Sequence, residues 1–386
     1  MGRQPPISGT CVEEFLPVRD AFVANFIERG EVGASICVMV GNDVVIDLVG
    51  GWRDAARTDP WGHDTLVDVY SAGKGVLATL ALEQIENGRL TLDGMVTAHW
   101  EEYACGGKDR TTVRHALAHL AGVPAIREPL TDDDLWNWES MTGALARTAA
   151  WFEPGTQVAY HVNTYGHLIG ELVRRAGGRT IAQTLRDLAA PLDADIWYSV
   201  PIEEQHRCAE VIFEVPRSLG TSVAEASRSP DEAHQMMVLA YLNPPGYGSA
   251  GVVNTPEWRS AEVPAANAHG TARGLAQIYA SLIVPNRIIS TDLLTEATRV
   301  QASGHCPLLG EQIEYGLGFV PTSARRRMGT NARAFGHFGT GGAVGFGDPD
   351  AGVAFGYVMN HVVPRWQSSR NRALIDTFYR CLHASN

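Results

Sequence analysis

The sequence predicts an α+β fold, with one antiparallel sheet built from both ends of the chain and a large helical part between them. Apolar, strand-like runs occur at residues 34–50 and again at residues 336–360. From Ser71 to about residue 310, apolar residues instead recur at helical spacing. The simplest arrangement that accounts for both patterns is a sheet flanked by helices with a helical insertion beside it. The predicted boundaries are residues 1–70 and 310–386 for the sheet domain and residues 71–309 for the mainly helical domain, with an active site at their interface.

The first predicted elements are a helix and a two-stranded hairpin. Residues 12–29 carry apolar side chains at near-helical spacing, and Gly30 follows as a stop signal. The apolar runs "ASICVMV" and "VVIDLVG" come next, and "GND" joins them. Gly, Asn and Asp tolerate positive φ, so this junction predicts a tight turn between two antiparallel strands.

Helical patterns then dominate until strand character returns near the C-terminus. Several of the helical patterns have Gly just past their end, which is a common stop signal. A Gly-rich apolar run and a second apolar run joined by "DPDAG" indicate two further strands. The helices are expected at residues 76–88, 112–122, 164–178, 181–189, 271–283 and 368–383, and the strands at residues 336–347 and 353–360.

Composition excludes several classes of function. The formal net charge of −12 disfavours binding to nucleic acid or to an anionic membrane surface. No window is long and apolar enough for a membrane span, and the first residues lack the apolar core of a signal peptide. The six cysteines show neither a CxxC pair nor metal-ligand spacing. We therefore expect a soluble, cytoplasmic protein without a metal site, a disulfide framework or a cofactor.

The stretch "YSAGK" at residues 70–74 places a serine three residues before a lysine. Residues i and i+3 lie on the same face of a helix, so the Ser71 hydroxyl and the Lys74 amine can meet there. A serine hydroxyl needs a nearby base, and lysine can be that base only if burial or a neighbouring cation lowers its pKa. The following helix is apolar at Val76 and Leu77, which predicts that Lys74 is desolvated.

Other interpretations of single motifs are weaker. A serine before a helix is also typical of an N-cap followed by a solvated lysine, and the four-residue motif alone does not exclude this. His115 and His119 have metal-ligand spacing, but no third ligand is evident, so we expect each imidazole to bond a loop carbonyl. Ser249 in "GYGSAG" has Tyr247 where the G-x-S-x-G nucleophile elbow requires glycine.

Further stretches join the serine and lysine into a larger pattern. In order they are "YSAGKG", "TVRHALAHLAGVP", "FEPGTQVAYHVNTYGHLIGEL", "ANAHGTARGLAQIYA" and "AFGHFGTGGAVGFGDPDAGVAFGYVMN". With them the chain, from about residue 30, resembles the class C β-lactamase-like serine hydrolases and especially the family VIII carboxylesterases. The resemblance implies the β-lactamase/transpeptidase-like fold.

The resemblance also implies roles for particular residues. Ser71 matches the acylated nucleophile, Lys74 matches its hydrogen-bonded partner, and Tyr160 matches the tyrosine that relays protons. The backbone amides of Ser71 and Thr340 match the oxyanion hole. Next to Thr340, the resemblance implies that His337, Gly339 and Gly341 border the substrate.

Two positions depart from the β-lactamase pattern. His337 occupies the place of the lysine that helps to hold the β-lactam carboxylate, so a carboxylate anchor is weakened. The β-lactamases have Tyr-x-Asn, whereas here Val162 follows Tyr160 by two residues and the asparagine is Asn163. Either Asn163 does not do the family asparagine's work, or Tyr165 or His161 is the matching residue. We prefer Tyr160, which lies five residues after Gly155 in the "PG" turn; Tyr165 is then a core aromatic. Candidate residues of the substrate pocket are Asn163, Trp136 and Trp151.

These patterns predict a cofactor-free serine carboxylesterase that acts on small-molecule, short-chain esters through an acyl-enzyme. The same fold would also allow an acyltransferase of the lovastatin-transferase type, or β-lactamase, D-amino peptidase or amidase activity. The non-enzyme alternative is a catalytically inactive homologue that only binds a ligand. Whether the chain forms a homo-oligomer is left open by its sequence.

Overall fold

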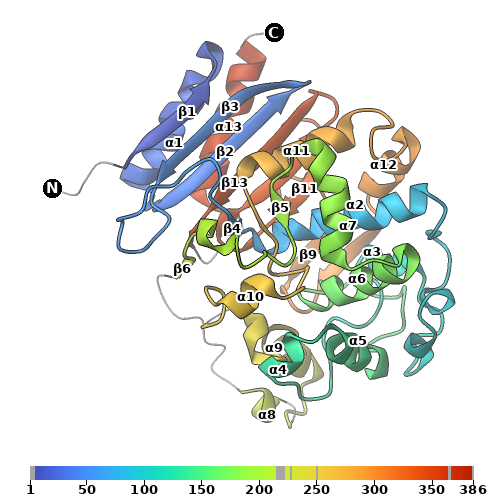
Figure 1. Cartoon of the computed structure of the whole chain (residues 1–386). Coiled ribbons are helices and arrows are strands. Elements are labelled where there is room, and N and C mark those ends of the chain that lie inside the picture. The colour runs from blue at the N-terminus through green and yellow to red at the C-terminus, as the bar shows by residue number, and fades with distance from the viewer. Residues whose placement is uncertain (1–4, 214–221, 227, 249–250, 364–366, 385–386) are drawn as a thin grey trace.

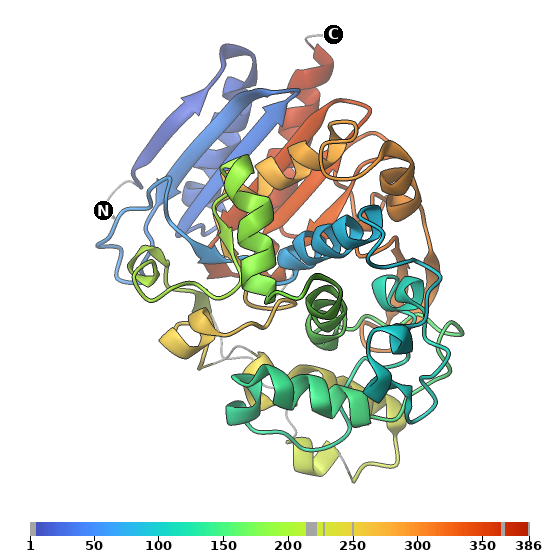
Figure 2. The ribbon, with the colours of Figure 1, turned by 45° about the vertical axis from the view of Figure 1, so that its right-hand side comes forward.

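The computed structural model describes residues 5–213, 222–226, 228–248, 251–363 and 367–384, and Ser249 lies outside these ranges. It confirms the predicted fold class. A seven-stranded antiparallel sheet has the strand order β1-β3-β2-β13-β12-β11-β10. Figures 1 and 2 show this sheet on one side of the molecule and helices from the middle of the chain on the other. Its strands are β1 (Ile7–Cys11), β2 (Gly33–Val40), β3 (Asp43–Gly51), β10 (Val320–Pro321), β11 (Phe335–Phe338), β12 (Val344–Asp348) and β13 (Val353–Met359).

Strands from the N-terminal and the C-terminal parts of the sequence pair in the middle of the sheet. The predicted hairpin is present, because β2 pairs with β3 and Val40 lies opposite Asp43 across a two-residue turn. Gly41 in that turn has φ 60°, the left-handed conformation that glycine adopts without strain. Strand β13 pairs with β2, so strands from the two ends of the sequence lie side by side at the sheet centre. Both strands are largely buried apolar segments.

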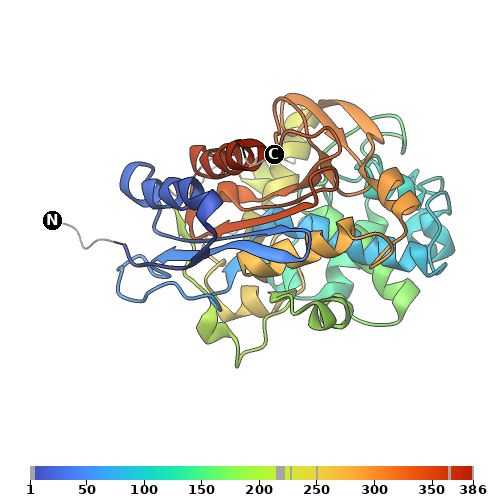
Figure 3. The ribbon, with the colours of Figure 1, turned by 90° about the horizontal axis from the view of Figure 1, so that it is seen from above.

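Helices cover both faces of this sheet. Figure 3 shows α1 (Leu16–Glu28) and α13 (Ser369–Ala384) side by side on one face and α11 (Ala272–Ile283) on the other. The rings of Phe15 and Phe378 stack at 4.9 Å in the first layer. In the second layer, a Cβ atom at Gly356 would lie 2.0 Å from the Ala272 carbonyl oxygen. Glycine at that position therefore lets α11 lie directly on the sheet.

The helical part packs against the α11 side of the sheet and carries three short sheets. The helix α2 (Gly73–Glu86) is almost entirely buried and packs on α6. The other helices are α3 (Val113–Leu117), α4 (Asp132–Leu135), α5 (Trp138–Arg147), α6 (Thr164–Gly177), α7 (Ile181–Ala189), α8 (Val223–Ala226), α9 (Glu232–Leu242), α10 (Pro256–Ser260) and α12 (Thr291–Thr298). The short sheets pair β4 (Val67–Asp68) and β5 (Ile196–Trp197) with β7 (His269–Gly270), β8 (Ala302–Cys306) with β9 (Glu311–Tyr315), and β6 (Ile212–Phe213) with β14 (His361–Val362).

Two sequence predictions differ from the structure, and one strand was not predicted. The strand predicted at residues 336–347 is two strands, β11 and β12, separated by a Gly-rich turn. The helix predicted at residues 112–122 ends at Leu117, because His119 has φ 62° and cannot continue it. Strand β1 was not predicted, because its middle residues are exposed and polar or glycine. Among the described residues, no helix is long and apolar enough to cross a membrane.

A buried ion pair joins α13 to the connection between α1 and β2. Arg370 donates to Glu31 at 3.2 Å and to the backbone oxygens of Arg29, Gly30 and His361. Burial raises the pKa of Glu31 to about 7, although Arg370 and a hydrogen bond from a tyrosine lower it. Both side chains are almost fully excluded from solvent. The contact therefore ties together the helices on the outer face of the sheet.

We expect Arg370→Met to lower the free energy of unfolding by about 3–5 kcal/mol, because it leaves the buried Glu31 carboxyl without its cation. Denaturant titration followed by circular dichroism measures this loss. Arg333→Met is the control, because Arg333 pairs with Asp350 at the surface and should cost less than about 1 kcal/mol. Adding Glu31→Gln to Arg370→Met should recover part of the loss. Equal losses for Arg370→Met and Arg333→Met would mean that the buried ion pair does not stabilise the fold more than a surface pair does.

Candidate active site

Ser71 and Lys74 lie where a short strand turns into the buried helix α2. Ser71 is half-buried in a 3-10 turn, η2 (Tyr70–Ala72), between β4 and α2. The Lys74 amine nitrogen lies 3.0 Å from the Ser71 hydroxyl oxygen. It also donates to the backbone oxygen of Ala265 at 2.8 Å. The i, i+3 spacing thus brings the hydroxyl and the amine to hydrogen-bond distance.

The environment of Lys74 favours the neutral amine. Its side chain is fully buried in α2. Burial lowers the pKa of Lys74 well below its ordinary value. A neutral amine keeps a lone pair that can accept a proton, while one N–H bonds Ala265. The site therefore contains a base within reach of a serine hydroxyl.

Tyr160 lies beside this pair. The Lys74 amine is 5.1 Å from the centre of the Tyr160 ring. Burial raises the pKa of the Tyr160 phenol well above its ordinary value, and Tyr315 adds to the rise, whereas a hydrogen bond with Ser71 lowers it. The phenol is therefore protonated at neutral pH, and it is in contact with the serine.

Aromatic rings fix the position of Tyr160. Its ring stacks on Tyr315 of β9, with ring centres 5.7 Å apart and an interplanar angle of 7°. The ring of His337, on β11, stacks on the Tyr160 ring with the ring centres 6.3 Å apart. The ring of His119 packs on the Tyr160 ring with the ring centres 5.1 Å apart. The Tyr160 backbone N–H donates to the Cys306 sulfur at 3.3 Å. Tyr160 is thus held by strands of two sheets, the two-stranded β8–β9 sheet and the seven-stranded sheet.

The Gly-rich turn after β11 lies against the serine turn. This turn, η8 (Thr340–Gly342), adjoins η2. A Cβ atom at Gly339 would lie 2.1 Å from the Val69 carbonyl oxygen, so glycine is what allows this approach. Gly341 has φ 86° and packs against Met359. Among the described residues, the backbone N–H groups of Ser71 and Thr340 show no acceptor, as oxyanion donors require before substrate binds.

His337 is a neutral side chain in this setting. It is 3% exposed, and its Nδ1 lies 2.7 Å from the Phe338 carbonyl oxygen. Burial, with a contribution from Lys74, lowers the pKa of His337 to about 3. Its Nε2 has no hydrogen-bond partner among the described residues. The position where β-lactamases carry a lysine therefore holds no positive charge here.

The three candidate pocket residues have polar or ring contacts with other parts of the chain. Asn163 donates to the Ala240 carbonyl oxygen of α9 at 2.9 Å, so its amide nitrogen is engaged away from Ser71. Trp136 is half-buried and meets Trp258 edge-on at 6.5 Å. The Trp151 indole N–H donates to the Ala125 carbonyl oxygen, and Arg127 covers its ring at 3.6 Å. Among the described residues, no hydrogen bond or ring contact joins these three side chains to Ser71.

The histidines and the second tyrosine have structural contacts. His115 Nδ1 accepts from the Thr112 N–H, and His119 Nδ1 accepts from the His161 N–H. Both imidazoles thus accept hydrogen bonds from backbone N–H groups. The predicted bonding to loop carbonyls is wrong, because the backbone group that faces each ring nitrogen is a donor and not an acceptor. Tyr165 is fully buried in α6. Among the described residues, no group of three or more His, Cys, Asp or Glu side chains could hold a metal ion.

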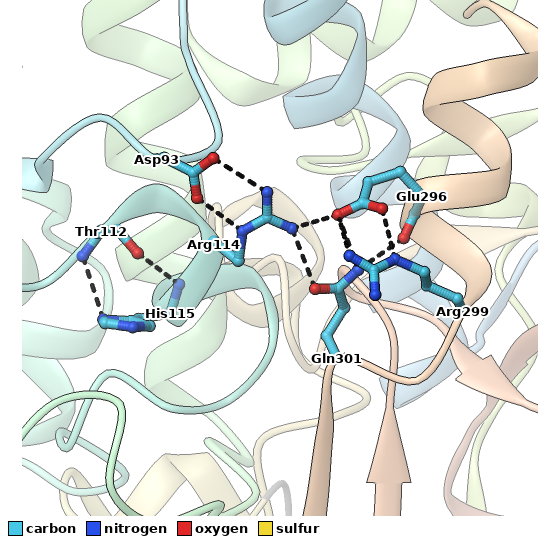
Figure 4. A network of polar contacts seen from close by, with 7 residues as sticks. All are labelled: Asp93, Thr112, Arg114, His115, Glu296, Arg299 and Gln301. Atoms are coloured by element: carbon cyan, nitrogen blue, oxygen red, sulfur yellow. Dashed lines mark hydrogen bonds and ion pairs between the residues drawn. The ribbon is translucent and has the colours of Figure 1, made fainter.

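A polar network holds the strand pair that carries Tyr315. Figure 4 shows Arg114 of α3 bonded on one side to Asp93 and on the other to Glu296 and Gln301. Gln301 directly precedes β8, and its backbone N–H donates to the Tyr315 carbonyl oxygen at 2.8 Å. Bonds from arginine side chains lower the pKa of Glu296 to about 2, so it is ionised. The network therefore joins α3 to the support of the Tyr160 ring.

Sequence reasoning missed several groups at the site. The Ala265 acceptor is a backbone oxygen, which no residue type reveals. Tyr315 lacked a motif, although an aromatic residue at the end of a polar strand is a weak signal for it. Arg326 was also missed: its buried guanidinium pairs with Glu311 and lies 5.9 Å from the Tyr315 ring centre.

Comparison with known proteins agrees with this geometry. The sequence matches the beta-lactamase family over residues 19–377. The chain belongs to the beta-lactamase family. It is 30% identical to the esterase/beta-lactamase LipL of Mycobacterium tuberculosis, over 92% of this chain and 83% of that protein. A crystal structure of a family VIII carboxylesterase is 35% identical, with a TM-score of 0.88 over 97% of this chain and all of that one.

A penicillin-binding protein homologue from Caulobacter crescentus is 33% identical, with the same TM-score of 0.88 over 97% of this chain and all of that one. The predicted family and fold are therefore confirmed. Membership of the beta-lactamase family, with esterase relatives, also confirms the predicted enzyme class, a serine hydrolase.

Proposed function

We propose that this protein is a carboxylesterase that cleaves short-chain esters through an acyl-enzyme on Ser71. The observation that carries this proposal is the buried Lys74 amine at 3.0 Å from the Ser71 hydroxyl, with its pKa lowered by burial. Binding alone would not need a desolvated amine beside a serine. The esterase relatives add support.

In the first step, the Ser71 oxygen attacks the ester carbonyl carbon while its proton passes to the Lys74 amine. The carbonyl oxygen becomes negatively charged, and the Ser71 and Thr340 N–H groups stabilise it. Tyr160, protonated because burial raises its pKa, donates its proton to the departing alkoxide. The Lys74 ammonium then restores that proton to Tyr160. The alcohol leaves, and the acyl group remains on Ser71.

In the second step, water takes the place of the alcohol. It attacks the acyl carbon as its proton passes through Tyr160 and Lys74, and the carboxylic acid leaves as the Ser71 hydroxyl re-forms. An alcohol that entered instead of water would make the same site an acyltransferase. Incubation with candidate alcohols and a search for transesterified product separates these two outcomes.

The chemistry at His337 favours neutral acyl groups. Its imidazole is uncharged because its pKa is about 3. A substrate carboxylate placed there would lose its water without gaining a cation. Neutral esters are thus better substrates than β-lactams or other compounds that carry a carboxylate near the reacting carbonyl.

We also propose that the protein acts in the cytoplasm and that its active site lies between the sheet domain and the helical domain. All six cysteines are free thiols, which suits a reducing compartment. The site includes the end of β11 and the start of α2, which come from these two parts.

The first test is covalent labelling. We expect a fluorophosphonate probe or 4-nitrophenyl acetate to add one adduct at Ser71, because the nearby neutral amine activates that hydroxyl. Mass spectrometry of the intact protein and of its peptides measures the adduct, and Ser71→Ala is the control that should lose it together with ester hydrolysis. A protein that gives neither adduct nor hydrolysis would be a ligand-binding homologue, and the proposal would be wrong.

The second test concerns the proton relay. We expect Tyr160→Phe to lower kcat by about 10²- to 10⁴-fold, because it removes the group that protonates the leaving alkoxide. Tyr165→Phe is a matched control: it removes a buried phenol oxygen with no hydrogen-bond partner among the described residues, so kcat should change less than about threefold. Steady-state kinetics and melting temperatures measure both variants. Near-normal turnover by a folded Tyr160→Phe protein would transfer this role to another residue.

The third test compares substrates of equal length. We expect kcat/KM for 4-nitrophenyl butyrate to exceed that for the 4-nitrophenyl monoester of succinic acid by at least about tenfold, because no cation offsets the desolvation of the second carboxylate. The Ser71→Ala protein supplies the background rate for each ester. Equal values would mean that a cation, such as that of Arg326, reaches the acyl group.

A further inference from the structure

The residue before the nucleophile has an unusual backbone conformation. Tyr70 has φ 51°, in the left-handed region that non-glycine residues seldom adopt. Such a conformation costs free energy and persists only where the surroundings hold it in place. Because Tyr70 directly precedes Ser71, its backbone angles set the direction in which the serine leaves the strand β4.

Asp68 supplies the contact that holds this turn. One carboxylate oxygen, Oδ1, accepts the Tyr70 backbone N–H at 2.7 Å. The other, Oδ2, accepts the Trp258 indole N–H at 2.8 Å. The Asp68 side chain is fully buried. The Asp68 carboxyl group accepts one N–H on each oxygen and is therefore held in a single orientation. Burial raises its pKa to about 8, although the bonds from Tyr70 and Trp258 lower it.

The same segment that anchors Asp68 also anchors Lys74. The Ala265 carbonyl oxygen accepts from the Lys74 amine, and the Ala268 carbonyl oxygen accepts from the Val69 N–H at 2.8 Å. Asn267 closes this segment on itself by donating to the Trp258 and Ala261 carbonyl oxygens. The serine turn and its base are therefore both held by residues 258–268, and Asp68 is the side chain that connects the turn to this segment.

We propose that Asp68 is a positioning residue for acylation, which keeps Tyr70 left-handed so that the Ser71 hydroxyl stays at the Lys74 amine. This inference rests on the proposed acyl-enzyme chemistry of Ser71. A merely structural carboxylate would change stability and leave the rate of acylation unaltered. A positioning residue changes the rate through the backbone of Tyr70, and a residue that adopts positive φ freely should make it dispensable.

A double-mutant cycle tests this mechanism. Asp68→Asn keeps one oxygen acceptor but turns an amide N–H₂ toward the second N–H donor. With 4-nitrophenyl acetate as substrate, we expect it to slow the pre-steady-state release of 4-nitrophenolate by at least about tenfold while KM changes less than about threefold. The reason is that the variant displaces the attacking Ser71 hydroxyl and leaves substrate binding unchanged. In a Tyr70→Gly background, Asp68→Asn should cost less than about threefold, because glycine adopts positive φ without an anchor.

Asp348→Asn is the matched control. Asp348 at the end of β12 is also fully buried and accepts from the Asn331 amide and the Tyr379 hydroxyl. We expect it to lower the melting temperature without slowing acylation. A folded Asp68→Asn protein that acylates at the wild-type rate, or one that is slowed equally in both backgrounds, would overturn the proposal.

Two further measurements keep the test decisive. If Asp68→Asn does not fold, Trp258→Phe replaces it in the cycle, since this change removes one bond to Asp68 and retains the other. It should slow acylation less and lose its effect in the Tyr70→Gly background; an effect that is the same in both backgrounds would overturn the proposal. Labelling of the wild-type protein at Ser71 separates failure of the esterase proposal from failure of the Asp68 proposal. If Ser71 is not labelled, the esterase proposal is wrong. If Ser71 is labelled, the cycle tests the role of Asp68 alone.

Discussion

The chemistry of this protein depends on one constraint, an amine that is kept out of water beside a serine hydroxyl. Lys74 is fully buried, and its hydrogen-bond partners in the described part of the chain are the Ser71 hydroxyl and the Ala265 carbonyl oxygen. A carbonyl dipole orients the amine without the full charge that would stabilise an ammonium ion. Had an acidic side chain been the partner, its negative charge would have raised the pKa of Lys74 and removed the base.

That constraint explains why the site is assembled from many segments. A single helix could bring Ser71 to Lys74 but could not exclude water from both. The fold adds Tyr160 before α6, Tyr315 from β9 and His337 from β11. The rings of Tyr315 and His337 pack on that of Tyr160, which lies beside the amine. Side chains that are neutral fill this space, so burial lowers the pKa of Lys74 without a nearby cation having to do so.

Much of the fold and part of the site could be predicted from the sequence, and the misses have a common cause. The helix α6 was predictable because its side chains show the helical period, and the strand β13 because it is a short, continuous apolar run. Strand β1 and the early end of α3 depend on partners or on a single left-handed residue, His119. In the site, Ser71 and Lys74 follow from local spacing. The Ala265 acceptor does not, because a backbone oxygen reached over 191 residues leaves no trace in residue type.

The neutral imidazole of His337 and the lowered pKa of Lys74 have the same physical cause, which is burial. A lysine at position 337 would place a second buried amine close to the first, and at most one of them could hold a proton in so little water. With an imidazole of pKa about 3 in that place, Lys74 is left to titrate alone against the serine and the phenol. The guanidinium of Arg326, which pairs with Glu311, lowers the pKa of His337 further and so also favours its neutral form. Burial among uncharged side chains therefore has two consequences: position 337 carries no cation for a substrate carboxylate, and the pKa of Lys74 is lowered.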